Sequence, residues 1–141
     1  MSRDLMNSIN PKVALAPVVV ADNTAQVCAI IDNSGYESLT YVIATGTLVD
    51  ADATFTVTLE HGDDPALADT SQVTSTDIIG TTALASFTFA ADIKTFKIGY
   101  IGIHRYSRLT ITPANNTGAA PLSVVAILGH AKSAPTPNPP V

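Results

Sequence analysis

Charged side chains are scarce in this sequence of 141 residues. Only 13% are Asp, Glu, Lys or Arg, about half of the roughly 25% typical of globular domains. There is no tryptophan, and Cys28 is the only cysteine, so no disulfide can form within the chain. No apolar run reaches the roughly 18 residues of a membrane-spanning helix, and the first residues lack the apolar core of a secretory signal. The sequence predicts one soluble, cytosol-made domain with no membrane partner.

Motifs for catalysis or ligand binding are also missing. His61, His104 and His130 have no metal-ligand spacing to one another or to Cys28, and no glycine-rich phosphate loop occurs. Cys28 lies in an apolar stretch, which predicts a buried, inert thiol. Acidic pairs such as Asp63–Asp64 fit no calcium-binding pattern and are expected to be solvated turn residues. We therefore expect no enzyme, no catalytic residue, no cofactor and no metal.

The two signs of charge are segregated along the chain, whose net charge is −5. No Lys or Arg lies between Val13 and Ile93, where eleven acidic residues occur, and no acid follows Ile93. Neighbouring strands could neutralise one another inside the monomer, or complementary faces could meet other copies or a larger assembly. A nucleic-acid partner is not expected, because the protein is acidic and its few cations are dispersed.

The pattern of apolar residues predicts β-strands of two kinds. Residues 53–60, 86–89 and 108–112 alternate apolar residues with Thr, Ser or Arg, which is typical of half-buried antiparallel strands. Residues 13–20, 27–31, 39–48, 96–103 and 121–128 are apolar on both faces and are expected to be more deeply buried. These eight segments, separated by Asn-, Asp- and Gly-containing turns, predict an all-β fold, an eight-stranded antiparallel jelly-roll sandwich.

Two terminal segments and one loop fall outside this pattern. Residues 1–10 are expected to form an N-terminal arm, and residues 133–141, with four prolines, an extended C-terminal tail that cannot join a sheet. The jelly-roll domain then covers residues 11–132 and includes a long acidic loop at 62–82. Terminal arms either fray or lie on a partner.

Four segments of the sequence resemble those of a known family: NPKVALAPVVVADNTAQV, GYESLTYVIATGTLVDADATFTVTLE, KIGYIGIHRYSRLTITPANNTG and VAILGHAKSAPT. They are similar to small proteins of tailed-phage and prophage head modules, the capsid cement or head decoration proteins, over about residues 10–136. The resemblance implies a jelly roll that forms homodimers on the capsid outer surface of the virion. It further implies a role in bridging subunits of the major capsid protein without covalent bonds, in a protein made in the bacterial host cytoplasm. The family provides no catalytic residue to carry over.

Charge and expected exposure suggest which residues contact the capsid or the dimer partner. The candidates are the N-terminal segment with Leu5 and Met6, the acidic loop 62–82, and the cations Arg3, Lys12, Lys94, Lys97, Arg105 and Arg108. Two other functions stay open. Jelly rolls also serve as carbohydrate-binding modules, although this chain has no tryptophan for a sugar platform. A low-copy neck or tail component of the same virion would share the composition.

Overall fold

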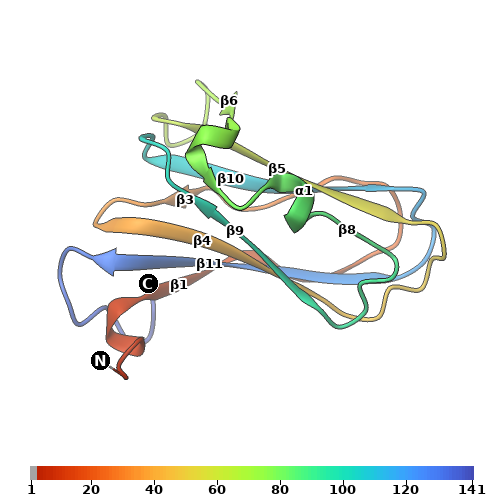
Figure 1. Cartoon of the computed structure of the whole chain (residues 1–141), viewed down its shortest axis with the longest axis horizontal. Coiled ribbons are helices and arrows are strands. Elements are labelled where there is room, and N and C mark those ends of the chain that lie inside the picture. The colour runs from red at the N-terminus through yellow and green to blue at the C-terminus, as the bar shows by residue number, and fades with distance from the viewer. Residues whose placement is uncertain (1–2) are drawn as a thin grey trace.

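Two antiparallel β-sheets, packed face to face, form the molecule in a computed structural model that describes residues 3–141 (Figure 1). The five-stranded sheet has the order β1 (Asn10–Val20), β11 (Ala120–Ala131), β4 (Tyr36–Thr45), β9 (Thr95–Tyr100) and β7 (Ile78–Ile79). In the six-stranded sheet, β10 (Tyr106–Ala114) pairs with β5 (Thr54–Gly62). Short strands flank this pair: β2 (Gln26–Val27) and β3 (Ile31–Asp32) beside β10, β6 (Ser71–Gln72) and β8 (Phe87–Thr88) beside β5.

The path of the chain between the sheets is that of a jelly roll. Since β2 and β3 share one flank of β10, and β6 and β8 share one flank of β5, the six-stranded sheet has four strand positions. With β1, β11, β4 and β9 these make the eight positions of a jelly roll, and β7 extends one edge. The chain crosses to the other sheet after β1, β3 and β4, and again after every strand from β6 to β10, as the Greek-key connections of a jelly roll require. The predicted antiparallel sandwich is confirmed.

Aromatic and branched side chains from both sheets fill the space between them. On β5 the alternation buries Phe55, Val57 and Leu59, each at most 1% exposed. Phe55 stacks on Phe87 with ring centroids 4.9 Å apart, and Phe87 stacks on Phe96 at 5.1 Å. Because Phe96 belongs to β9 of the opposite sheet, this stack joins the two layers.

A buried hydroxyl pair also crosses the core. The Tyr41 hydroxyl of β4 lies 2.7 Å from Ser107 Oγ of β10, which gives both buried oxygens a hydrogen-bond partner. Burial raises the pKa of Tyr41 well above its usual range, so the phenol stays neutral. A polar pair of this kind fixes how the two sheets face each other.

The strands that read as apolar on both faces are buried on one face only. Their inner side chains, such as Ile43 and Val124, are fully buried. Their outer side chains are open to solvent: Val13 is 63% exposed, Val19 60% and Val125 36%. The expectation of deep burial on both faces is therefore wrong for β1, β4 and β11. Within residues 3–141 the terminal segments border the outside of the five-stranded sheet at one end, near Thr40 and Ile127, and leave most of it open to solvent.

The segment expected as a long acidic loop, residues 62–82, contains short elements. It holds β6, the 3₁₀ helix η2 (Ser75–Asp77) and β7, and it leads into α1 (Thr82–Ala85). Leu67 and Val73 are buried, and Val73 N–H donates to the Leu59 carbonyl at 3.0 Å. The acidic residues therefore sit on a segment that packs against β5.

The two terminal segments lie against each other at one end of the sandwich (Figure 1). The 3₁₀ helix η1 (Met6–Ser8) precedes β1. The buried Thr136 donates its N–H to the Asn7 carbonyl at 3.0 Å and its hydroxyl to the Ile9 carbonyl at 2.6 Å. Asn10 Nδ2 donates to the Val141 carbonyl at 3.0 Å. The predicted arms thus clasp each other here, and residues 1–2 of the N-terminal arm lie outside the described residues.

Candidate docking surface

Two of the six predicted contact residues are engaged in ion pairs within the chain. Arg105 donates from Nε and Nη2 to the two carboxylate oxygens of Asp32, at 2.8 Å each. Arg108 pairs with Glu60, which lies directly opposite on β5. The hydrogen bond from Arg105, with a smaller coulombic effect of Lys12, holds the pKa of Asp32 below its usual value. The positive charges of Arg105 and Arg108 are therefore balanced by acids of the same monomer.

The other four predicted cations have no ion pair among residues 3–141. Arg3, Lys94 and Lys97 are exposed, and Lys12 is half-buried. Lys97 points outward from β9, while Lys94 precedes that strand and Arg3 precedes η1. The six predicted residues therefore do not form one patch. Arg105 and Arg108, at the start of β10 and within it, are paired with acids, and the other four have no ion pair among residues 3–141.

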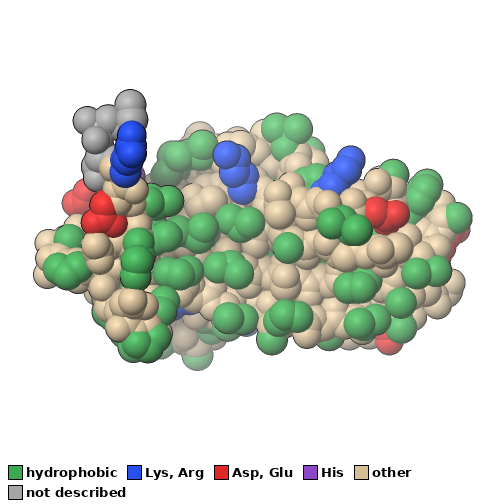
Figure 2. Space-filling view, turned by 90° about the horizontal axis from the view of Figure 1, so that it is seen from below, with side chains coloured by type: hydrophobic (Ala, Val, Ile, Leu, Met, Phe, Trp, Pro, Cys, Tyr) green, Lys and Arg blue, Asp and Glu red, His purple; other side chains and the backbone are tan. Residues whose placement is uncertain are grey.

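The outer face of the five-stranded sheet is almost uncharged and combines apolar side chains with Ser and Thr, such as Ser123 and Thr40. Strand register places Val13, Val125, Val42 and Lys97 in one row across β1, β11, β4 and β9. The five strands contain one carboxylate, Glu37, which shares the parity of the inward-facing residues of β4 and lies at the rim. Figure 2 shows a broad surface of uncharged and hydrophobic atoms on this side of the molecule, with cations toward one margin and acids at the periphery. We call this surface the valine face.

Glycines keep part of the valine face flat. In the row next to Val125, Gly99 of β9 stands beside Ile79 of β7, and a Cβ on Gly99 would come within 3.2 Å of Ile79 Cβ. A Cβ on Gly129 would come within 2.7 Å of Ser38 Oγ. Because both positions lack a side chain, Ile79 and Ser38 occupy the space beside them, and both glycines are buried.

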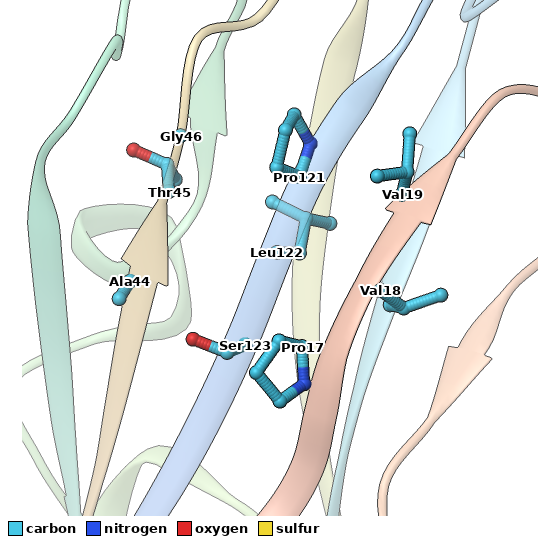
Figure 3. A pocket seen from close by; sticks show the side chains of 9 residues that line it. All are labelled: Pro17, Val18, Val19, Ala44, Thr45, Gly46, Pro121, Leu122 and Ser123. Carbon is cyan, nitrogen blue, oxygen red and sulfur yellow. The ribbon is translucent and has the colours of Figure 1, made fainter.

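A shallow groove marks the end of this face near Gly46 (Figure 3). It has a volume of about 270 Å³ and lies between β1, β11 and β4. Pro17, Val19, Pro121 and Ala44 contribute to its walls. No charged side chain lines it, so its shape suits an apolar protein side chain better than a charged ligand.

The outer face of the six-stranded sheet has a different chemistry. Register pairs Thr58 with Thr110 and Thr56 with Thr112 across β5 and β10, next to the Arg108–Glu60 pair. Cross-strand threonines pack and hydrogen-bond well in an antiparallel pair, and their hydroxyls are readily hydrated. This face therefore presents polar groups together with an ion pair formed within the chain.

The histidines that sequence analysis considered separately meet at one end of the sandwich. His61 Nδ1 lies 2.8 Å from the Tyr100 hydroxyl, His104 Nδ1 lies 3.0 Å from Asp63 Oδ2, and the two imidazole centroids are 4.4 Å apart. Burial, followed by the charge of His104, lowers the pKa of His61. Burial raises the pKa of Tyr100 to about 12. The cluster is a hydrogen-bond network that ties β5 and β9 to the start of β10.

No group of three or more His, Cys, Asp or Glu side chains within residues 3–141 is arranged to hold a metal ion. Burial raises the pKa of Cys28 to about 12, so its thiol stays protonated and unreactive near neutral pH. No helix in the described part of the chain is long and apolar enough to span a bilayer.

Comparisons with known proteins give a fold likeness. No family profile matches the chain, and no curated protein matches it in sequence. Among solved structures, the PBSX exported protein XepA aligns with a TM-score of 0.52 at 12% identity, over 87% of this chain and 37% of XepA. Infectious bursal disease virus, Gx strain, aligns with a TM-score of 0.52 at 12% identity, over 90% of this chain and 33% of the viral chain. A family 35 carbohydrate binding module from an environmental isolate gives 0.46 at 13% identity, over 87% and 93%.

The likeness to XepA and to the viral chain concerns the fold, and the fold of this chain is a β-sandwich. This chain spans only about a third of the length of XepA and of the viral chain. At such low identities the shared feature is the two-sheet fold, which hosts many functions.

Sequence reasoning missed the valine face, although the signal for it was present. Residues 13–20, 39–48 and 121–128 are apolar on both faces. That pattern predicts deep burial, because strands that are apolar on both faces are usually covered on both sides. The sequence does not specify whether the covering layer belongs to the same chain.

Proposed function

We propose that this chain is a structural virion protein, a capsid cement protein that binds the outside of a phage head and bridges subunits of the major capsid protein. The observation that carries the proposal is the valine face, an apolar sheet surface that the chain itself leaves uncovered. The sequence resemblance to head decoration proteins and the jelly-roll topology support it. We propose no catalytic activity and no cofactor.

A cement protein of this kind acts by mass action. It binds the assembled shell and not the dissociated subunits, so its binding free energy stabilises the shell. We propose that it works as a homodimer, because two linked copies that engage neighbouring subunits gain avidity even when each contact is weak. The ordered jelly-roll framework suits this role, since a rigid surface loses little entropy on docking.

Copy number in purified particles tests the proposal. Quantitative mass spectrometry would compare this chain with the major capsid protein of the same phage. We expect a ratio near that of a lattice-wide component, and we expect heads stripped of the chain to break at lower temperature. A few copies per particle would instead indicate a neck or tail component.

Absence from particles would overturn the proposal and favour a carbohydrate-binding module. That function needs a sugar platform, usually of exposed aromatic rings. Tyr41 and Tyr100 are buried, so such a platform would depend on the half-buried Tyr36 and Tyr106. Glycan-array binding that is lost when both are changed to Ala would establish this alternative.

A further inference from the structure

We propose that the valine face is the surface that seats on the shell, and that the matching shell surface is flat, partly apolar and acidic beside Lys97. This inference rests on the proposed function and makes it specific, since it names the docking surface and the chemistry of its partner. It also replaces the set of dispersed cations as the contact surface. Arg105 and Arg108 are excluded, because their charges are already paired within the chain.

The apolar character of the face supports docking. Its central row begins with Val13, Val125 and Val42 on three adjacent strands. Val13 and Ile79, near the two edges of the sheet, are 63% and 62% exposed. Thr40 and Ser123 lie in the neighbouring rows, so the face is a partly apolar surface that suits a partner with both apolar and polar groups.

Charge identifies the kind of partner. The chain carries a net charge of −5, yet the outward-facing positions of the five-stranded sheet include no acid, and the central row ends in the unpaired Lys97. Lys94 lies exposed just before the same strand. Two valine faces brought together would add lysines without any carboxylate to pair them. An acidic partner surface would instead gain complementary pairs and faster association.

The size of the face is adequate for a specific contact. β11 pairs with β4 from Tyr36 to Thr45, a length of roughly 31 Å at about 3.4 Å per residue. Four strands spaced by about 4.8 Å make a width of roughly 19 Å. The resulting area, on the order of 600 Å², approaches the roughly 800 Å² per partner of a standard interface.

A binding experiment with matched variants tests the inference. Particles assembled without this chain would be incubated with purified wild-type chain, and binding would be measured by co-sedimentation. Val125→Glu places a carboxylate at the centre of the valine face, and Thr112→Glu places the same group on the exposed face of the other sheet. Lys97→Glu changes an exposed residue, so it tests the face even if Val125→Glu fails to fold. Circular dichroism would establish that each variant is folded.

We expect Val125→Glu and Lys97→Glu each to weaken binding about tenfold or more, as interface-centre substitutions do, with Thr112→Glu close to wild type. The Lys97→Glu loss should be larger at about 50 mM salt than at about 0.5 M, because screening weakens charge pairs. Wild-type affinity of both face variants would overturn the inference and leave the cement proposal standing. Failure of the wild-type chain to bind would overturn the cement proposal itself.

The self-association of the chain distinguishes a second copy from the shell. Sedimentation velocity of the same variants reports the dimer. If Val125→Glu abolished the dimer while shell binding stayed unchanged, the valine face would be the seat of a second copy and the inference would be wrong. Loss of shell binding with an intact dimer supports it.

Discussion

The two sheets of this jelly roll satisfy their outer faces in different ways. On the six-stranded sheet, β5 and β10 present paired threonines and the Arg108–Glu60 ion pair, so polar groups meet partners within the chain or in water. On the five-stranded sheet, the equivalent positions present Val125, Val42 and Ile127. The difference shows that β5 and β10 keep their large aliphatic side chains inside the sandwich, whereas β11 exposes one of its valines, Val125, to solvent.

The comparison also explains the scarcity of charge. A monomer that spends its life in water generally carries many charged residues for solubility. Here 13% of residues are charged, and two of the seven cations, Arg105 and Arg108, are paired with acids on the six-stranded side. The five-stranded sheet therefore has little charge to keep it solvated, which is tolerable for a surface that becomes covered.

The largest effect is expected where the two sheets meet. Phe55→Ala removes a ring that is 1% exposed and that stacks on Phe87. The lost burial and the resulting cavity should lower the free energy of unfolding by about 3–5 kcal/mol, measured by urea denaturation. Val125→Ala, on the valine face, is the control and should cost less than about 1 kcal/mol. Equal losses would mean that the valine face is as important for folding as the space between the two sheets, which contradicts the comparison.

The next effect tests the satisfied face. Arg108→Met removes the ion-pair partner of Glu60 at a site where both side chains are about one quarter exposed, and leaves Glu60 only the hydrogen bond from the Thr70 hydroxyl. Hydrogen bonds to charged groups contribute about 1.5–3 kcal/mol, and a loss in this range is expected in the same denaturation assay. Lys97→Met removes a cation that has no ion pair among the described residues and should change stability by less than about 0.5 kcal/mol. A small Arg108→Met effect, equal to that of Lys97→Met, would remove the distinction between paired and unpaired cations.

Much of the fold could be predicted from residue patterns. The alternation at residues 53–60 and 108–112 predicted half-buried strands, and these became the central pair β5 and β10. Periodicity could not separate the four two-residue strands that share two positions of the six-stranded sheet, because segments such as 31–32 are too short to carry a period. Their pairing is decided by contacts with β5 and β10 rather than by local sequence.

The candidate site was less predictable, for two physical reasons. Ion pairing depends on distant partners: Arg105 meets Asp32 from 73 positions earlier in the chain, so sequence order could not show that its charge was neutralised. Burial depends on which layer covers a strand. The apolar outer side of residues 121–128 predicted a covering layer, but no local pattern distinguishes a layer of the same chain from one supplied by another molecule.

A smaller effect concerns the histidine network that ties the sheets at one end. Since the pKa of His61 is lower in the folded chain than in the unfolded chain, the unfolded state binds the proton more readily. Stability should therefore be full above the unfolded pKa of about 6.5 and should fall as the pH drops below it, until the folded pKa is passed. We expect the melting temperature to decrease between about pH 7.5 and 5.5, with a smaller change than Arg108→Met produces.

His61→Asn isolates this residue from the other histidines. The variant lacks the titrating imidazole, so its melting temperature should depend less on pH across the same window. Asp63 stays ionised in this range, because the hydrogen bond from His104 holds its pKa below the usual value. Parallel pH curves for the wild type and the variant would show that His61 does not couple protonation to folding.

The smallest effect on folding is expected for Lys97→Glu, and this is the sharpest form of the comparison. Lys97 is exposed, and no salt bridge to it occurs within residues 3–141, so charge reversal should change the free energy of unfolding by less than about 0.5 kcal/mol. If Lys97 is dispensable for folding but needed for shell affinity, then its contribution lies in binding. Combined with a tenfold loss of shell affinity, worth about 1.4 kcal/mol, an unchanged unfolding curve would separate the two roles at a single residue. A stability loss as large as that of Arg108→Met would instead show that the charge of Lys97 is used within the fold, and the contrast between the two sheets would fail.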